Sequence, residues 1–228
     1  MTSCSKSCKS SFANLWNSSS LAWSPALDFT RVTFLDKELF TDLIEGDQRK
    51  ADLIAQVYTL DGQPEIVLLH VEVERQRRLT FPARMHDYYH ALRLRKKAAV
   101  YPIVVYLSPG AGGLVRETHI DSVFDEEVDR FTYQAVGLPD LSADDYRDSE
   151  NVLASGLSAL MRVSALGKAV QKAWILRRVA QSTENEARKF LRVNVIESYL
   201  PLAGPEAEEF ERLTEQPEAQ EVREMISV

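Results

Sequence analysis

Residues 68–76 read Leu-Leu-His-Val-Glu-Val-Glu-Arg-Gln, an apolar run that gives way to two carboxylates. Side chains alternate between the two faces of a strand, so we expect Val71 and Val73 on one face and Glu72 and Glu74 on the other. Two acids on one face of an apolar strand are costly to bury unless a partner compensates them. The pattern predicts a strand with a divalent-cation site at its end. A half-exposed strand whose glutamates face water stays open as the alternative.

A second acid, Asp52, lies in another apolar run, Ala-Asp-Leu-Ile-Ala-Gln-Val at 51–57. The turn residues Asp-Gly-Gln-Pro at 61–64 separate the two runs and predict a hairpin. If the two strands pair, Asp52 and Glu72 can converge on one ion. These two acids are the first candidates for a metal site.

The whole chain has the pattern of an α/β protein with a helical C-terminal part. We expect strands at 32–39, 50–60, 65–74 and 100–107, a helix at 81–97 and a helical region over 140–200. The helix at 81–97 has apolar residues at helical spacing, namely Phe81, Met85, Tyr88, Tyr89 and Leu92. The expected parts are a Ser-rich, poorly ordered segment (1–27), an α/β core (28–138), a helical region (139–204) and an acidic tail (205–228).

Composition indicates a globular protein in water, because 45% of the residues are hydrophobic and 27% are charged. No apolar run in the sequence approaches the length that crosses a bilayer, so we expect no membrane partner. Cys4 and Cys8 are the two cysteines, which favours a reducing compartment over a disulfide framework. We therefore expect a cytoplasmic protein.

The net charge of −7 argues against nucleic-acid binding, but the charge is unevenly distributed. Eight basic residues gather between the carboxylates and the next expected strand. They are Arg75, Arg77, Arg78, Arg84, Arg93, Arg95, Lys96 and Lys97. A local positive field steers anionic ligands whatever the total charge, which favours contact with DNA. A solvated helix face is the alternative interpretation of this cluster.

The order of these motifs from about Asp28 to Ser108 resembles the Rpn-type recombination-promoting nucleases, a transposase-related family of the PD-(D/E)xK nuclease superfamily. The resemblance covers roughly a third of the chain. It rests on Phe-Leu-Asp-Lys-Glu-Leu at 34–39, Ala-Asp-Leu at 51–53 before Asp-Gly at 61–62, His-Val-Glu-Val at 70–73, Phe81, Arg84-Met85, Tyr88 and Tyr-Pro-Ile-Val at 101–104.

The resemblance implies an αβββαβ core, a mixed central sheet flanked by helices, with Asp52 and Glu72 as the metal-binding acids. It implies a DNA endonuclease that hydrolyses phosphodiester bonds with Mg²⁺, for which Mn²⁺ can substitute. The ion would polarise a scissile phosphate and lower the pKa of a bound water. Arg84 and the other basic residues would bind flanking phosphates. Analogy with superfamily members that cut two strands suggests a homodimer.

Two features depart from the family. The superfamily has Lys two residues after the Glu and the Rpn-type family has Gln, whereas this chain has Glu74. Glu74 could bind the ion or act as general base, and Gln76 could supply the missing amide. Residues 11–24 lack the apolar pattern of the family's first helix, and their serine run at 18–20 leads to the hypothesis of a frameshift near the start. The predicted catalytic set is Asp52, Glu72, Glu74 and Gln76.

Two further functions stay open. The chain could be a decayed relative in which Glu74 and the altered N-terminus have removed activity, leaving a DNA-binding or self-associating protein. It could also be a helical interaction protein that presents the acidic residues 205–228 to a basic partner. Loss of metal binding on Asp52→Ala would favour the enzyme, and loss of partner binding on deletion of the tail would favour the interaction protein.

Other candidate ligands are less complete. His86 and His90 are one helical turn apart and could share a metal, but the sequence offers no acid or cysteine at matching spacing nearby. Cys4 and Cys8 could complete a zinc site with them. The Gly-Ala-Gly-Gly segment at 110–113 lacks the Lys-Ser/Thr of a phosphate-binding loop, so a flexible turn is predicted there.

Overall fold

The computed structural model describes residues 27–35, 53–59, 66–74, 78–149, 152–216 and 219–226. The chain divides into two compact units between Gly137 and Leu138. The described residues of the first unit form a sheet with one helix, and those of the second are helical. The expected Ser-rich segment 1–27 lies outside the described residues, apart from Leu27.

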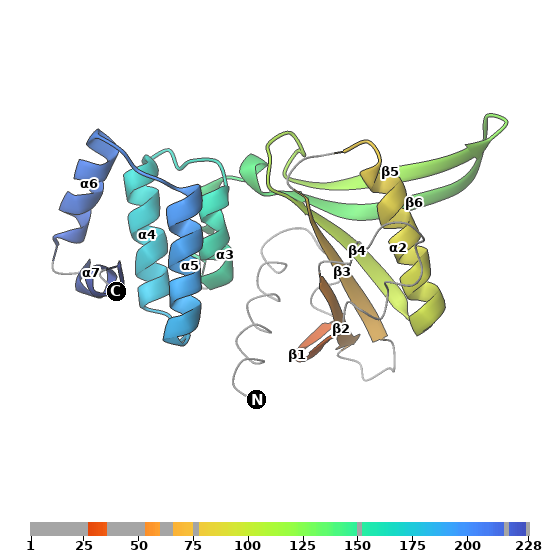
Figure 1. Ribbon diagram of the computed structural model, residues 1–228, viewed down its shortest axis with the longest axis horizontal. Coiled ribbons are helices and arrows are strands. Elements are labelled where there is room, and N and C mark those ends of the chain that lie inside the picture. The colour runs from red at the N-terminus through yellow and green to blue at the C-terminus, as the bar shows by residue number, and fades with distance from the viewer. Residues whose placement is uncertain are drawn as a thin grey trace. The chain divides into compact units, whose positions relative to one another are not determined.

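The first unit is built on a six-stranded mixed sheet with the strand order β1-β2-β3-β4-β6-β5 (Figure 1). Its elements in chain order are β1 (Leu27–Phe34), β2 (Leu53–Thr59), β3 (Ile66–Glu74), α2 (Phe81–Lys96), β4 (Ala99–Tyr106), β5 (Leu114–Val123) and β6 (Glu126–Gly137). The prediction of an α/β protein with a mixed sheet is confirmed. The first strand ends at Phe34, five residues before its expected end at Leu39.

Strands β2 and β3 pair antiparallel, as the hairpin prediction requires, with Leu53 opposite Val71. Strands β3 and β4 run parallel, and helix α2 makes the crossover between them. Strand β6 pairs parallel with β4, so the carboxyl ends of β3, β4 and β6 meet at one edge of the sheet. Ligand sites in sheets with parallel strands tend to lie at that edge.

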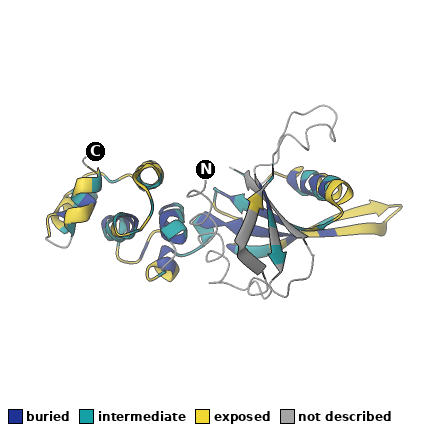
Figure 2. Cartoon of the chain, turned by 90° about the horizontal axis from the view of Figure 1, so that it is seen from below, coloured by how far each residue is buried: buried dark blue, intermediate teal, exposed yellow. Residues whose placement is uncertain are grey.

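Helix α2 covers one face of the sheet (Figure 1) because its apolar side chains recur on one side. Phe81, Met85, Tyr88 and Leu92 are buried, whereas the outward positions are exposed (Figure 2). The helix ends at Lys96 and is capped by Lys97, which has a left-handed backbone (φ 51°) and donates its N–H to the carbonyl of Arg93. Both ends agree with the prediction to within one residue.

The hairpin of β5 and β6 was not predicted from the sequence, and it extends the sheet well past α2 (Figure 1). Its tight turn is formed by Phe124 and Asp125, which both have positive φ (52° and 66°), as in a type I′ turn. The far part of the hairpin is exposed on both strands (Figure 2). The segment 110–113, predicted as a flexible turn, connects β4 to β5, and its residues Gly110, Gly112 and Gly113 have positive φ.

The second unit has the 3₁₀ turns η3 (Leu138–Asp140), η4 (Ala143–Tyr146) and η5 (Ser158–Leu160). Its helices are α3 (Val152–Leu157), α4 (Lys168–Ala180), α5 (Glu186–Tyr199), α6 (Pro205–Thr214) and α7 (Gln220–Ile226). Buried Ile175, Leu176 and Ile196 centre its core. Phe210 of α6 and Val222 of α7, within the expected acidic tail, pack into this core. Among the described residues, no helix is both long and apolar enough to cross a membrane.

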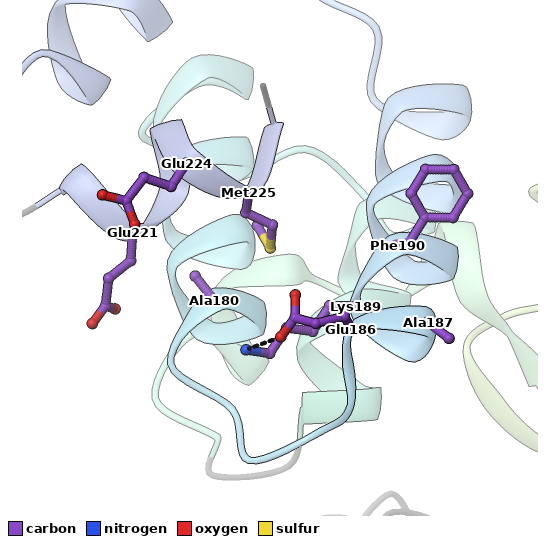
Figure 3. Close-up of a pocket in the computed structure, with 8 residues that line it drawn as sticks. All are labelled: Ala180, Glu186, Ala187, Lys189, Phe190, Glu221, Glu224 and Met225. Carbon is purple, nitrogen blue, oxygen red and sulfur yellow. Dashed lines mark ion pairs between the residues drawn. The ribbon is translucent and has the colours of Figure 1, made fainter. Parts of the chain in front are cut away.

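A pocket of about 600 Å³ opens within the second unit, between the end of α4, the start of α5 and α7 (Figure 3). Its lining consists of Ala180, Glu186, Ala187, Lys189, Phe190, Glu221, Glu224 and Met225. Lys189 pairs with Glu186 (Nζ to Oε1, 3.3 Å). Because Glu221 and Glu224 also line the pocket, its lining carries more negative than positive charge. An acidic lining repels phosphates, which makes this pocket a poor site for nucleic acid.

Candidate functional site

The carboxyl end of β3 is the expected location of the metal-binding acids. In the backbone register Glu72 lies opposite Val104 of β4 and Glu74 opposite Tyr106. Leu53 and Val71, the sequence neighbours of Asp52 and Glu72, are paired across β2 and β3. Asp52, Gln76 and the side chain of Glu72 lie outside the described residues. Strand β2, described from Leu53 on, therefore pairs with the strand that carries Glu72, as the hypothesis requires.

Glu74 forms an ion pair with Arg84, which lies in the first turn of α2. Both side chains are largely buried, with 12% of Glu74 and 19% of Arg84 exposed. The Arg84 guanidinium also lies 4.9 Å from the centroid of the Phe81 ring, which is itself buried in the core. A partly buried charge pair with an aromatic support holds a cation in a fixed position beside the end of β3.

The other predicted DNA-binding residues occupy separate places. Arg78 is exposed just before α2, and Arg75 and Arg77 lie outside the described residues. The last turn of α2 and its cap carry the exposed residues Arg93, Arg95, Lys96 and Lys97. Lys96 is twelve residues after Arg84, about 18 Å along a helix, so Arg84 is the only described member of the set that contacts Glu74.

Under α2, the carboxylate of Glu117 is buried between two tyrosines, a constellation that the sequence did not indicate. The hydroxyls of Tyr106 and Tyr133 donate to Glu117 Oε2 over 3.1 and 2.6 Å. Phe81 packs edge-on against both rings, with centroids 6.0 Å apart in each pair. Burial and the hydrogen bond to Glu117 raise the pKa of the Tyr133 hydroxyl well above its usual value.

This raised pKa predicts a loss of stability at high pH. Above about pH 10 the unfolded chain releases the Tyr133 proton while the folded chain keeps it, so the free energy of unfolding falls by up to about 1.4 kcal/mol per pH unit. The Tyr133→Phe variant should be less stable at pH 7 by about 1.5–3 kcal/mol but should decline less steeply above pH 10. Urea unfolding from pH 7 to 11 measures both effects, and equal slopes for the two proteins would contradict the prediction.

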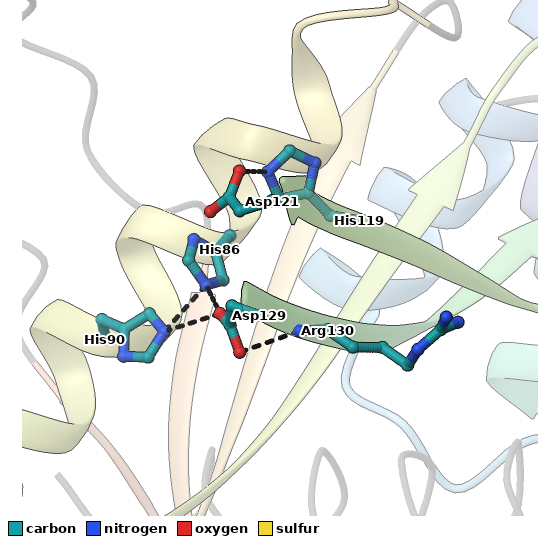
Figure 4. Close-up of polar contacts among 6 residues, drawn as sticks. All are labelled: His86, His90, His119, Asp121, Asp129 and Arg130. Atoms are coloured by element: carbon teal, nitrogen blue, oxygen red, sulfur yellow. Dashed lines mark hydrogen bonds and ion pairs between the residues drawn. The ribbon is translucent and has the colours of Figure 1, made fainter. Parts of the chain in front are cut away.

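Three of the four histidines in the chain meet where α2 faces the β5–β6 hairpin (Figure 4). His86 Nε2 lies 2.6 Å from Asp129 Oδ2 and 2.8 Å from His90 Nε2. His90 Nε2 lies 3.9 Å from Asp129 Oδ2. The hydrogen bond with His86 lowers the pKa of the Asp129 carboxyl. His119 Nε2 pairs with Asp121 Oδ1 at 3.0 Å on the other side of His86 (Figure 4).

The sequence pointed to His86 and His90 but not to their partner. Asp129 is 43 residues after His86, and only the unpredicted hairpin brings it beside the helix. The alternation of β5 and β6 gives a partial signal, because His119 and Asp121 fall on one face of β5 and the register sets Asp129 opposite Asp121.

Comparisons with models of protein families, with curated proteins and with solved structures each gave no match. No relative therefore supplies the role of any residue. The chemistry proposed below for the carboxyl end of β3 and for the histidine cluster therefore rests on the side chains that each of them brings together.

Proposed function

We propose that this protein is a Mg²⁺-dependent DNA endonuclease related to the Rpn-type recombination-promoting nucleases, with a PD-(D/E)xK-like core. The observation that carries the proposal is the carboxyl end of β3, where Glu72 and Glu74 end a strand that is parallel to β4 and Arg84 contacts Glu74. The chain order β1, β2, β3, α2, β4 supports it, because the resemblance implies αβββαβ and the described residues follow that order from the first strand on.

The donors expected at this site suit magnesium. Asp52 and Glu72 would hold the ion through carboxylate oxygens, the ligands that Mg²⁺ prefers. The pairing of Leu53 with Val71 supports this assignment, since each neighbours one of the acids in sequence. When bound, Mg²⁺ supplies a Lewis acid that polarises the phosphate and makes a bound water more acidic.

Arg84 offers an explanation for the acid at position 74, the feature of the motif that departs most from the superfamily. The superfamily has a lysine two residues after the Glu, and this chain has Glu74 there instead. In this proposal Glu74 orients Arg84, and the guanidinium provides the positive charge that stabilises the charge developing on the phosphate. The largely buried ion pair and the contact with Phe81 support a fixed guanidinium. Gln76 is then the residue proposed to position the attacking water.

The basic end of α2 is proposed to bind DNA away from the cut. The separation of about 18 Å between Arg84 and Lys96 corresponds to about five base pairs along B-form DNA. Arg93, Arg95, Lys96 and Lys97 would contact phosphates, which gives affinity without sequence readout. Arg78, before the helix, and the neighbouring Arg75 and Arg77 would contact phosphates closer to the cut.

Cleavage of supercoiled plasmid by the purified full-length protein tests the proposal. We expect nicking with Mg²⁺ or Mn²⁺ and none with EDTA. Asp52→Ala and Glu72→Ala should each lower the rate at least about 100-fold, because an ion contributes several kcal/mol to the transition state. Arg84→Ala should lower the rate at least about tenfold. Glu74→Gln introduces the residue of the family and keeps an oxygen that can accept a hydrogen bond from Arg84, so this variant should still cleave, at a rate between those of the wild type and Arg84→Ala.

Asp87→Asn is the matched control, since Asp87 is an exposed acid of α2 that belongs to neither candidate site. Circular dichroism and thermal unfolding establish that each variant is folded. A folded wild-type protein that cuts with neither ion contradicts the proposal and favours the decayed relative, which filter binding of labelled DNA would then test.

A further inference from the structure

The histidine cluster is separate from the acids proposed for Mg²⁺ and offers different donors. Its members come from two elements far apart in sequence: His86 and His90 from α2, and Asp129 from β6. One ligand atom from each lies within 4.8 Å of the others. His119 and Asp121 of β5 form a second such group with His86.

The backbone fixes this arrangement. His86 and His90 are one turn apart, so their side chains share a face of α2. Asp121 lies directly opposite Asp129 in the β5–β6 register, and directly opposed residues in an antiparallel pair project to the same face. Opposed carboxylates destabilise a hairpin unless positive charge compensates them. A cation bound between α2 and the hairpin would supply that compensation.

The hydrogen bonds among these groups do not account for the geometry. An imidazole nitrogen carries either one hydrogen or one lone pair in the ring plane. His86 Nε2 lies within 3 Å of both a carboxylate, which only accepts, and a second imidazole nitrogen. If its hydrogen is donated to Asp129, it has neither a lone pair for His90 nor a second hydrogen. A divalent cation would accept a lone pair from all three atoms at once.

The distances suit a small tetrahedral ion. Zinc bonds of 2.0–2.1 Å place neighbouring ligand atoms about 3.3 Å apart in a tetrahedron. The separations of 2.6, 2.8 and 3.9 Å among His86 Nε2, His90 Nε2 and Asp129 Oδ2 bracket that value. The exposed side chains of His90 and Asp129 leave a fourth position open to water. The carboxylate of Asp121 lies on the opposite side of His86 (Figure 4), where outer carboxylates commonly orient a histidine ligand.

We propose that His86, His90 and Asp129 bind Zn²⁺, or another cation that prefers imidazole, and that this ion fastens the β5–β6 hairpin to α2. Two imidazoles and one carboxylate select zinc, cobalt, nickel or copper over magnesium, which prefers oxygen ligands. The site is therefore independent of the proposed nuclease chemistry. It adds a contact where the hairpin leaves the body of the sheet.

Metal titration of the full-length, metal-stripped protein in the absence of DNA tests the site. We expect one Co²⁺ per chain with the visible spectrum of a tetrahedral ion, and its displacement by Zn²⁺ but not by Mg²⁺. His90→Gln and Asp129→Asn should each weaken Zn²⁺ binding more than about 100-fold, because loss of even an outer partner commonly costs 10–100-fold. Asp87→Asn and the double variant Cys4→Ser, Cys8→Ser should bind as the wild type does.

Hydrogen exchange gives a second readout that unfolded variants cannot imitate. Zn²⁺ should slow amide exchange in peptides covering 119–131 of the wild type and leave those of His90→Gln unchanged. Wild-type protein that binds no Zn²⁺ at micromolar concentration would overturn the proposal. Binding that survives His90→Gln and Asp129→Asn but is lost in Asp52→Ala would also overturn it, by assigning the ion to the end of β3.

Discussion

Replacing Glu117 by alanine is expected to destabilise the first unit by about 3–5 kcal/mol. The buried hydroxyls of Tyr106 and Tyr133 both lose their charged acceptor, and hydrogen bonds to charged groups contribute about 1.5–3 kcal/mol each. The removed side chain also leaves a cavity beneath α2. Denaturant-dependent hydrogen exchange, measured on peptides from β4 and β6, follows this unit separately from the helices of the second.

Glu117→Gln is the matched control. It keeps the volume and one oxygen acceptor but loses the charge, so we expect a loss of only about 1–2 kcal/mol. Equal losses for the alanine and glutamine variants would mean that charge alone stabilises the tyrosines. A loss below about 1 kcal/mol for Glu117→Ala would contradict the importance of this buried carboxylate.

Replacing Ile175 by alanine is expected to destabilise the second unit by about 2–5 kcal/mol, the usual cost of removing a buried aliphatic side chain. Ile175 is fully buried in the core formed by α4, α5 and α7. The first unit carries both the end of β3 and the histidine cluster. Below the unfolding temperature of the variant, Zn²⁺ binding and plasmid cleavage should therefore stay at wild-type levels.

Thermal unfolding followed by hydrogen exchange in α4 and α5 measures this effect. Arg177→Ala is the control on the same helix, because Arg177 is exposed and its loss should change stability by no more than about 0.5 kcal/mol. If Ile175→Ala also abolished Zn²⁺ binding in a folded first unit, the two units would be coupled, and the independence expected here would be wrong.

The hydrophobic patterns were sufficient to predict β3, α2 and β4, because each pattern is long and matches one period. In α2, for example, Phe81, Met85, Tyr88 and Leu92 are all buried as predicted. The β5–β6 hairpin could not be predicted in the same way. Its strands are polar over most of their length, and its turn uses Phe124 and Asp125 at positive φ rather than the usual Asn-Gly.

The sequence by itself determined the α/β class, the pairing of β2 with β3, and the helical spacing of His86 and His90. Local periodicity carries this information, since it depends only on neighbouring residues. Only the tertiary structure decided that Arg84 contacts Glu74 and that Asp129 lies against His86. Both contacts depend on how α2 packs against the sheet. This packing brings together residues that are 10 and 43 positions apart in the sequence, and no local periodicity predicts such pairs.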